Sequence, residues 1–484
     1  MILKELLQKV EVKEVVGTLE TEISGLTADS KHVMDGDMFI CFRGGENDGH
    51  SYAAEAVASG AVAVVAERKL DLPVCQLLVE NGRKAMSDFA RAFYGDPAQK
   101  LNIIGVTGTN GKTTTAHMLA SILNGAGENC ALIGTLGVCY ANREIAPSLT
   151  TPDPIFLHKI FADMVACGVK YVVMEVSAHA IYYDKIAGIR FSHCIFTNCT
   201  EDHLDFFKDM ESYAAVKRSL FTQQRCGCAI VNTDDTVGAS LMNGEVRAFG
   251  YALENPADVF AVDVYESVRG SRFVLNLFDD LYEVELHMAG RHNVYNAMAA
   301  SACAKLLGVK TVDIGKGLSG LKKVSGRLEH VGDFRGADIF VDFAHTPDGL
   351  EKSLSALKTH CRGKLICVFG CGGNRDAQKR PVMGEVSGRI ADFTVLTSDN
   401  PRYEDPFDII VQIEEGLRKA SKNYVIVADR EKAIGYAVDK LSEGDVLLIA
   451  GKGGETYQEI MGVRHIYSDI STVNLILKAK EMKR

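Results

Sequence analysis

Residues 108–117, GTNGKTTTAH, combine glycines, a lysine and threonines in a spacing that could bind phosphate. Apolar residues precede this segment and a helical pattern follows it, as in a strand–loop–helix unit. In such a unit, backbone N–H groups of the loop and of the helix N-terminus bind phosphate oxygens. Lys112 adds a positive charge, and the hydroxyl of Thr113 can ligate Mg²⁺. We therefore expect ATP to bind here, the alternative being a glycine turn with a surface lysine.

The spacing of this loop distinguishes an ATP site from a dinucleotide site. It has the short form G-x-x-G-K-T, from Gly108 to Thr113, because Val106 stands where the longer Walker form has glycine. A second glycine cluster, FGCGGN at residues 369–374, lacks the G-x-G-x-x-G spacing of a dinucleotide loop. The sequence thus favours ATP over a dinucleotide.

Two residues that follow later apolar runs could complete a metal site. Glu175 ends YVVME, and His203 lies in TNCTEDHLDFF after the apolar CIF. Mg²⁺ prefers oxygen ligands, so a carboxylate together with phosphate oxygens would suit it. Taken alone, Glu175 fits a salt bridge equally well, and His203 fits a hydrogen-bonded structural histidine better than a ligand.

The elements that would position these residues alternate between apolar runs and helical patterns. The expected strands are DMFICF and AVAVVAE in the N-terminal part, then LNIIGVTG, CALIGTLG, YVVMEVS, HCIFTN and CAIVNTD, and finally DIFVDFAH, KLICVFG, DFTVLTSD, NYVIVAD and DVLLIAG. From about residue 258 to the HM at 287–288, alternation predicts antiparallel strands, and NVYNAMAASACAKLLG predicts a helix. Strands that alternate with helices predict parallel sheets, whose ligands bind beyond the carboxyl ends of the strands.

The length of 484 residues predicts about three domains of ~150 residues each. We place their boundaries at residues 1–97, 98–327 and 328–484, with GDPAQK at 95–100 as the first connector. The expected fold class is α/β: a small α/β N-terminal domain, a central P-loop-type ATPase domain with a mostly parallel sheet, and a C-terminal Rossmann-like domain.

Composition excludes several function classes. The net charge of −10 argues against general affinity for nucleic acid or anionic membranes. The chain shows neither the apolar core of a signal peptide nor a run of about 18 apolar residues. Its 13 cysteines form no paired framework, and Cys226 and Cys228 lack the second pair of a zinc site. We expect buried free thiols in a cytoplasmic, monomeric protein without membrane insertion.

Six motifs resemble, in order, those of the Mur ligase family, the ATP-dependent amide ligases of bacterial cell-wall precursor synthesis. They are GTNGKTT, MEVSAHA, TNCTEDHLDFF, GRHNVYNAMAA, SGRLEHV and VDFAHTPDGL. The segment ADSKHVMDGDMFICFRGGENDGH resembles a uridine-binding region that part of the family shares. Three further loops resemble the branch that adds the third amino acid, the MurE type: GCGGNRD, SDNPRYEDP and GKGGETYQ. The resemblance covers nearly the whole chain.

This resemblance implies a reaction. ATP would phosphorylate the free carboxylate of UDP-MurNAc-L-Ala-D-Glu, and the amine of meso-diaminopimelate would displace phosphate from the acyl phosphate. The implied catalytic residues are Lys112, Glu175, His203 and Lys217, which would hold the nucleotide phosphates and Mg²⁺. Lys217 matches a family lysine that CO₂ carbamylates, which turns an ammonium into an anionic oxygen ligand. Without the resemblance it is one more solvated helix lysine.

The same resemblance implies three sets of binding residues. The ATP set is Gly108, Thr109, Asn110, Gly111, Lys112, Thr113, Thr114, Asn293, Arg327 and Asp342, with Mg²⁺ on Thr113, Glu175, His203 and carbamylated Lys217. The UDP-substrate set is Ser30, Gly45, Glu46, Asn47, Thr150, Thr151, Ser177 and Lys185. The amino-acid set is Arg375, Asp399, Asn400, Pro401, Arg402, Gly451 and Glu455. Serines and threonines after strands often only cap helices, and that alternative stays open.

Arg402 is the residue expected to select the amine acceptor. Meso-diaminopimelate carries a distal carboxylate where lysine carries only an ammonium, and an arginine can bind that carboxylate through two parallel hydrogen bonds. Glu455 would take the distal ammonium and Arg375 the other carboxylate. A lysine acceptor would leave the arginine unpaired, which disfavours it by several kcal/mol. The alternative is a surface arginine in a turn.

Three other functions compete with this one: the same reaction with L-lysine, folylpolyglutamate synthesis, and a nucleotide-binding regulator without catalysis. The uridine-type region and DNPR argue against the second, and the intact catalytic residues argue against the third. The chain also departs from the family pattern at Lys185, where arginine is usual, at Gly454, where relatives have histidine, and at Ala178, where serine is common. Lysine lacks the planar fork of arginine, so Lys185 cannot make the same substrate contact.

Overall fold

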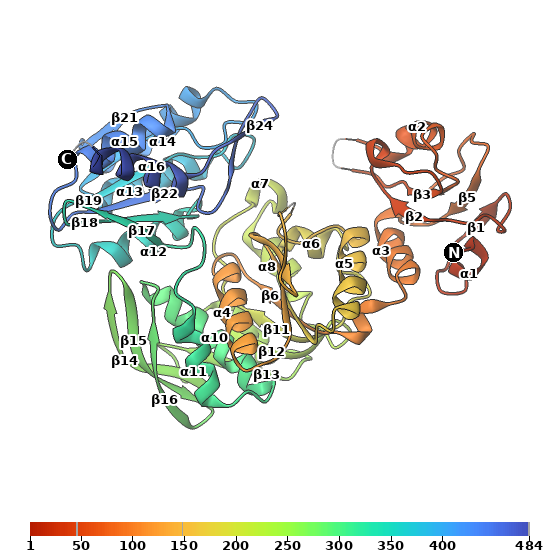
Figure 1. Ribbon diagram of the computed structural model, residues 1–484, viewed down its shortest axis with the longest axis horizontal. Helices are drawn as coiled ribbons and strands as arrows, with labels where there is room; N and C mark the ends of the chain where they lie inside the picture. Colours follow the sequence, from red (N-terminus) through yellow and green to blue (C-terminus); the bar gives the residue numbers. More distant parts are fainter. Residues whose placement is uncertain (45–46, 148, 483–484) are drawn as a thin grey trace.

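A computed structural model of the chain describes residues 1–44, 47–147 and 149–482. The chain forms three α/β domains, each with its own sheet and core (Figure 1). The N-terminal domain (red) and the C-terminal domain (cyan to blue) lie on different sides of the central domain (Figure 1). The expected α/β class is confirmed.

The N-terminal sheet has the strand order β1-β5-β4-β3-β2. Its strands are β1 (Glu14–Val16), β2 (Gly25–Thr27), β3 (Asp37–Ile40), β4 (Ala63–Ala66) and β5 (Cys75–Leu78), with helices α1 (Leu3–Leu6), α2 (Ala53–Ala58) and α3 (Gly82–Phe93) and the short helices η1 (Ser30–His32) and η2 (Gly49–Tyr52). Successive residues of β3 enter opposite cores, Met38 and Ile40 on one face and Phe39 on the other. Because both faces are buried, the strands read as continuous apolar runs.

The central sheet has the order β16-β15-β14-β13-β12-β11-β6-β10-β7-β8-β9. Its parallel core comprises β6 (Asn102–Thr107), β7 (Cys130–Gly134), β10 (Tyr171–Glu175), β11 (Phe191–Phe196), β12 (Cys226–Asn232), β13 (Ala248–Ala252) and β14 (Val259–Ser267). Antiparallel hairpins extend both ends: β15 (Gly270–Leu277) and β16 (Asp280–Leu286) at one, β8 (Gly137–Tyr140) and β9 (Arg143–Ile145) at the other. The antiparallel strands expected from residue 258 are confirmed.

Helices cover both faces of this sheet. They are η3 (Pro97–Lys100), α4 (Lys112–Gly125), α5 (Pro154–Ala166), α6 (Ala178–Tyr182), α7 (Leu204–Phe207), α8 (Met210–Arg218), α9 (Thr236–Leu241), α10 (Arg291–Leu306) and α11 (Thr311–Gly320). Helices α4 and α10 contribute to one core and α5 to the other. The N-terminal domain meets the central one where α3 contacts α5, and Ser87 Oγ donates to the Asp184 carbonyl over 3.0 Å.

The C-terminal sheet has the order β17-β18-β22-β19-β20-β21. Its strands are β17 (Glu329–Phe334), β18 (Ala337–Asp342), β19 (Leu365–Phe369), β20 (Phe393–Leu396), β21 (Tyr424–Ile426) and β22 (Val446–Ala450), and its helices are α12 (Pro347–Lys358), α13 (Lys379–Ile390), α14 (Pro406–Ala420), α15 (Arg430–Asp439) and α16 (Asp469–Glu481). Only β17 is antiparallel to its neighbour within the described part of this sheet. The five strands expected after residue 328 all form.

Sequence patterns missed two features of this domain. Strand β17 carries polar side chains at half of its positions, and the hairpin β23 (Tyr457–Ile460) and β24 (Val463–Ile466) stands apart from the main sheet. Neither buries a full apolar face, so neither produces a clear alternation.

The thirteen cysteines are all free, and most are buried as expected, although Cys139 in β8 is exposed. Across the described residues, no helix combines the length and the apolar character needed to cross a bilayer.

Candidate active site

A cleft of about 1590 Å³ lies between the central and C-terminal domains, at the carboxyl ends of their parallel strands. It brings together most of the residues singled out in the sequence. Those lining it are Thr109, Asn110, Gly111, Lys112, Thr113, Thr114, Thr150, Glu175, Ser177, His203, Asn293, Arg327, Asp342, Arg375, Asp399, Asn400, Arg402, Gly451 and Glu455. Gly108, Thr151, Lys185, Lys217 and Pro401 do not line it, and Ser30 and Asn47 belong to the N-terminal domain. Gly45 and Glu46 lie outside the described residues.

The phosphate loop occupies the turn between β6 and α4, as the sequence predicts. Gly108 has a φ of +147°, and a Cβ there would lie 1.9 Å from Thr197 Oγ1. Gly111 has a φ of +86°, and a Cβ there would lie 2.5 Å from Asn296 Oδ1. Both positions therefore require glycine, sterically and conformationally. The loop leaves its N–H groups at the start of α4, where an anion is stabilised.

Lys112 and Asn110, two of the polar side chains of this loop that line the cleft, have different partners. Lys112 Nζ donates to the carbonyls of Gly108 and Thr109, each 2.8 Å away. Burial lowers the pKa of Lys112, while Glu175 acts in the opposite direction. Asn110 Nδ2 donates over 2.8 Å to Asp348 Oδ2, on the C-terminal helix α12. The loop is thus tied to the opposite wall of the cleft.

Glu175 is almost fully buried, with an exposed fraction of 1%, at the end of β10. Its Oε2 accepts from the hydroxyls of Thr113 and Thr135, both at 3.0 Å, and its Oε1 accepts from Thr135 N at 2.8 Å. A Cβ on Gly134 would lie 2.1 Å from Oε1, so the neighbouring strand must carry glycine there. The result is a compact group of oxygen atoms beside the phosphate loop. Glu175 was expected from the sequence, whereas Gly134 and Thr135 were not, although they too follow an apolar run.

Arg327 extends from the interdomain linker into this site. Its Nη2 donates to Thr113 Oγ1 over 2.9 Å, and its guanidinium lies 4.3 Å from the centre of the Phe343 ring. Among the described residues, its buried Nε has no hydrogen-bond partner. A free donor beside a phosphate loop is suited to an anionic oxygen.

His203 and Lys217 lie behind the loop on the α7–α8 side. His203 caps α7 with a φ of +58°, its Nε2 lies 3.3 Å from Asp202 Oδ2, and desolvation lowers its pKa to about 3. Lys217 has an exposed fraction of 1% and places Nζ 4.4 Å from the centre of the Tyr213 ring. Burial, and then the charge of Lys112, lower the pKa of Lys217 to about 7. Both groups can therefore be neutral near pH 7, unlike a solvated lysine.

Several predicted ligands are already engaged within the protein. Asp342 accepts from Leu328 N and Phe343 N through Oδ1 and from Ser353 Oγ through Oδ2, at 3.0, 2.8 and 2.5 Å. Asn293 Nδ2 donates to the Ala289 carbonyl over 2.7 Å. Both side chains still line the cleft, while much of their hydrogen-bonding capacity stabilises the fold.

Thr151 and Ser177, which were expected to bind the peptide end of the substrate, have structural hydrogen bonds within the protein. Thr151 Oγ1 donates to the Glu175 carbonyl over 2.9 Å and accepts from Ser177 N at 3.0 Å. Ser177 Oγ in turn accepts from Ala180 N at 3.2 Å, which caps α6. Lys185 pairs with Asp153 over 2.7 Å. Their substrate contacts remain predictions.

The hairpin β23–β24 holds Arg402, which has a φ of +52°. Arg402 N donates to the Glu459 carbonyl over 3.1 Å, and its carbonyl accepts from Met461 N at 2.6 Å. Its Nη1 donates to the Gly373 carbonyl over 2.7 Å, and its Nε lies 3.6 Å from Glu459 Oε2. Arg375 lines the same part of the cleft, and its pKa is lowered by burial and then by Arg402. Two guanidinium groups thus line one end of the cleft, together with the carboxylates of Glu455 and Glu459.

A buried ion pair that the sequence did not reveal supports these loops. Arg380 is 1% exposed and binds both carboxylate oxygens of Glu404, through Nη1 at 2.8 Å and Nη2 at 3.0 Å. It also donates to the Gly372 carbonyl over 3.2 Å. The pair joins the GCGGNRD loop to the DNPRYEDP loop.

The donor set near the phosphate loop fits Mg²⁺ and a nucleotide. Thr113 Oγ1, Thr135 Oγ1 and the Glu175 carboxylate are oxygen donors crowded within hydrogen-bond distance, which suits a hard cation. The glycine cradle would be filled by any Cβ, which is the property of a loop that must approach phosphate closely.

Three family descriptions match successive parts of the chain. They are "Mur ligase family, catalytic domain" at residues 22–94, "Mur ligase middle domain" at 106–304 and "Mur ligase, glutamate ligase domain" at 326–453. Among curated relatives, the UDP-N-acetylmuramoyl-L-alanyl-D-glutamate--2,6-diaminopimelate ligase of Caldanaerobacter subterraneus subsp. tengcongensis is 41% identical over 463 residues, which cover 95% of each chain.

Solved structures show the same relationship. A structure titled UDP-N-acetylmuramoyl-L-alanyl-D-glutamate--2,6-diaminopimelate ligase is 30% identical, has a TM-score of 0.69 and matches over 99% of both chains. Folylpolyglutamate synthase of Mycobacterium tuberculosis is similar at a TM-score of 0.64 but is 17% identical, covering 76% of this chain and 92% of that one. At that identity the second likeness concerns the fold alone.

Proposed function

The chain belongs to the Mur ligase family, and we propose that it adds meso-diaminopimelate to the D-Glu carboxylate of UDP-MurNAc-L-Ala-D-Glu. The product is the UDP-MurNAc-tripeptide of peptidoglycan synthesis, and ATP is converted to ADP and phosphate. One observation carries the proposal: a single cleft holds the phosphate loop of Lys112 and Thr113 opposite the loop of Asn400 and Arg402. The 41% identical relative of that name supports the same reaction.

The reaction has two steps, phosphoryl transfer and then amide-bond formation. A carboxylate oxygen of D-Glu attacks the γ-phosphorus of ATP, the bond to the β-phosphate oxygen breaks, and ADP leaves. The neutral amine of the acceptor then attacks the acyl carbon, loses a proton, and phosphate leaves. Because three anionic groups must approach one another, most of the catalysis is positioning and charge neutralisation.

The residues of the phosphate loop would supply that neutralisation. Lys112 would exchange its two loop carbonyls for phosphate oxygens, and Arg327 would use its unpaired Nε. Thr113 and Glu175 would hold Mg²⁺, whose charge, when bound, screens the phosphates. Asn293 and Asp342 line the ATP part of the cleft, and Gly108, Thr109, Asn110, Gly111 and Thr114 complete the loop.

Lys217 and His203 would complete the cation site. Carbamylation requires a neutral amine, and the lowered pKa of Lys217, about 7, supplies one near neutral pH. A carbamate would then give an anionic oxygen in place of an ammonium that repels metal. His203 would stay neutral and offer a ring nitrogen.

The acceptor would bind where the C-terminal loops converge. Arg402 and Arg375 suit its carboxylates, and Glu455 suits its distal ammonium. Lysine, the competing acceptor, has no distal carboxylate for Arg402. Asp399, Pro401 and Gly451 would shape the pocket, because a Cβ on Gly451 would lie 2.7 Å from Asp399 Oδ2.

The remaining assignments rest on the family. Ser30, Gly45, Glu46 and Asn47 would hold the uridine end of the substrate, and Thr150, Thr151, Ser177 and Lys185 the peptide end. The domain limits 1–97, 98–327 and 328–484 and a monomeric, cytoplasmic state complete the proposal.

The test is phosphate release from ATP in the presence of UDP-MurNAc-L-Ala-D-Glu, with meso-diaminopimelate or L-lysine as acceptor. We expect a preference for diaminopimelate of at least about a hundredfold in kcat/KM, because lysine offers no distal carboxylate to the half-buried Arg402. Arg402→Ala should abolish this preference. Equal use of lysine by the unmodified protein would reject the assigned acceptor, and release with folate substrates alone would reject the reaction.

A further inference from the structure

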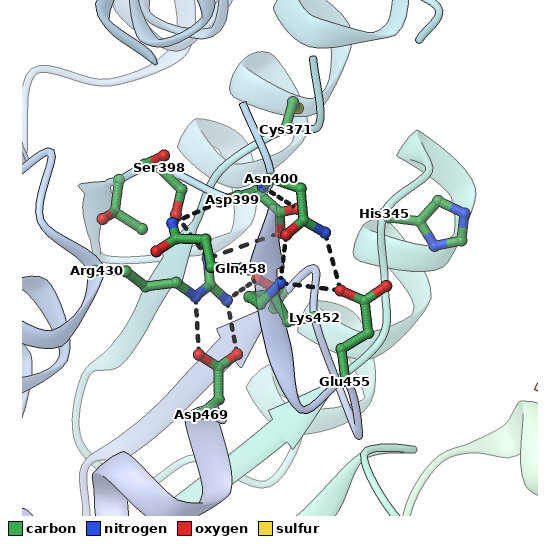
Figure 2. Close-up of polar contacts among 12 residues, drawn as sticks. His345, Cys371, Ser398, Asp399, Asn400, Arg430, Lys452, Glu455, Gln458 and Asp469 are labelled. Atoms are coloured by element: carbon green, nitrogen blue, oxygen red, sulfur yellow. Dashed lines mark hydrogen bonds and ion pairs between the residues drawn. The ribbon is translucent and has the colours of Figure 1, made fainter. Parts of the chain in front are cut away.

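Lys452 is a fully buried cation, with an exposed fraction of 0%. Figure 2 shows its side chain between those of Asn400 and Glu455. It lies between two cleft-lining residues, Gly451 and Glu455, but does not line the cleft itself. Its Nζ donates to Asn400 Oδ1 and to Glu455 Oε2, each 2.9 Å away. Burying an ammonium is costly unless it is paired and hydrogen-bonded. The bonds to Asn400 and Glu455 therefore hold Lys452 in this position.

These contacts fix which face of the Asn400 amide meets the cleft. Asn400 Oδ1 accepts from Lys452 Nζ and also from Glu459 N at 2.9 Å. Both partners can only donate, so the atom between them must be the amide oxygen. The amide nitrogen then lies on the Glu455 side and donates to Oε2 over 3.0 Å. The second N–H of this amide has no partner among the described residues, and Asn400 lines the cleft.

The same contacts use up one oxygen of Glu455. Its Oε2 accepts from both Lys452 and Asn400, whereas Oε1 has no hydrogen-bond partner within the described parts of the chain. Glu455 therefore offers an acceptor next to the donor of Asn400. A carboxylate and an ammonium on one carbon match a neighbouring donor and acceptor, whereas a lone ammonium matches only the acceptor.

We propose that Lys452 is a positioning residue for acceptor selection, which orients Asn400 and Glu455 so that together they bind an amino-acid group with both its charges. This inference rests on the proposed ligase function and deepens it. Lys452 touches neither substrate nor phosphate; it acts through the two side chains it holds. Without it, Asn400 Oδ1 keeps only the Glu459 N–H as a donor and Glu455 Oε2 keeps only the Asn400 N–H, so both side chains are held less firmly for the acceptor.

The experiment measures KM and kcat of Lys452→Met for all three substrates. We expect the KM for meso-diaminopimelate to rise at least about tenfold, as for loss of one charged hydrogen bond. The KM values for ATP and the UDP-substrate should stay within about twofold, and the ratio of kcat/KM for diaminopimelate over lysine should fall at least about tenfold. Lys358→Met is the matched control: Lys358 pairs with Asp392 at 2.6 Å in the same domain and does not line the cleft.

Three results would overturn the inference. They are an unchanged KM for diaminopimelate, a parallel rise of all three KM values, or a change equal to that of Lys358→Met. If Lys452→Met does not fold, the double variant Lys452→Met/Glu455→Gln removes both charges of the pair together. The KM of the double variant for diaminopimelate should not exceed that of Glu455→Gln by more than about threefold. The two side chains act as one unit, so the effects of changing them do not add. A larger excess rejects the inference. Failure of the unmodified protein to use diaminopimelate would instead reject the proposed function.

Discussion

Arg327 donates a hydrogen bond from Nη2 to the hydroxyl of Thr113, 2.9 Å away, and so joins the interdomain linker to the phosphate loop. The residue that begins the connection to the C-terminal domain thus contacts the residue that would ligate Mg²⁺. Asn110 and Asp348 form a second link between the same loop and helix α12. We therefore expect nucleotide binding to influence the orientation of the C-terminal domain through these contacts.

Arg327→Ala should raise the KM for ATP at least about tenfold and lower kcat, because a charged donor to the phosphates is lost. Arg327→Lys should recover only part of the loss, since lysine cannot reproduce the planar fork. Steady-state kinetics and nucleotide-binding calorimetry measure both. Lys322→Ala, an exposed linker residue, serves as control and should behave like the unmodified protein. Unchanged ATP affinity in Arg327→Ala would refute the phosphate contact.

Lys217→Ala should lose most activity, and short-chain carboxylates should restore part of it by replacing the carbamate oxygen. Absence of rescue would count against the carbamate.

The lowered pKa of Lys217 also predicts a pH-dependent stability. In CO₂-free buffer its pKa is about 7 when folded and 10.5 when exposed, so between these values the unfolded chain binds more protons. The free energy of unfolding should therefore rise with pH across this window, by up to ~1.4 kcal/mol per unit relative to Lys217→Met. Denaturant titrations of both proteins at several pH values measure the difference. If the free energy of unfolding changes with pH equally in both proteins, the pKa of Lys217 lies near its ordinary value.

Gly134→Ala should displace the Glu175 carboxylate, because the added Cβ would lie 2.1 Å from Oε1. We expect a destabilisation of about 1–3 kcal/mol and a marked loss of Mg²⁺-dependent ATP turnover. Gly320→Ala is the control, because a Cβ there meets nothing within 4 Å. Thermal unfolding and metal titration of activity compare the two variants. Equal metal dependence would show that Glu175 does not act on the cation.

Arg269, at the β14–β15 turn, pairs with Asp333 and Asp338 of the C-terminal domain at 2.6 and 2.8 Å. Its side chain is 61% exposed, so Arg269→Ala should cost less than about 1 kcal/mol of stability. The substitution should nevertheless loosen the two domains at low salt, and the difference should vanish near ~1 M salt. Small-angle scattering detects the change. Arg272→Ala, which breaks a pair with Glu283 inside the central domain, should leave the domain arrangement unaltered.

Gly454 illustrates why a departure from the family pattern needs a structure to interpret. A Cβ at this position would lie 3.1 Å from both Leu136 Cδ2 and Ser325 Oγ, so a histidine would require both neighbours to move. In this chain the GKGG loop packs directly against the interdomain linker. The sequence shows the substitution, while only the packing shows its consequence.

Local sequence determined most of the strands, including the parallel ones around the site, and the phosphate loop. Apolar periodicity and glycine placement act over a few residues, so β6, the loop at Gly108 and α4 follow directly from them. The same rule located Glu175, because polar residues that follow parallel strands meet at one edge of the sheet.

Tertiary structure decided which polar groups are free to act. The hydroxyls of Thr151 and Ser177 form hydrogen bonds with backbone groups, and Asp342 accepts from the backbone N–H of Leu328. Arg327, in contrast, has a buried Nε without a partner among the described residues. Lys452 stands in a glycine-rich motif like any surface lysine, yet it is buried between Asn400 and Glu455. Its partner Asn400 lies 52 positions away in the sequence, and no local pattern encodes a contact made by folding across that distance.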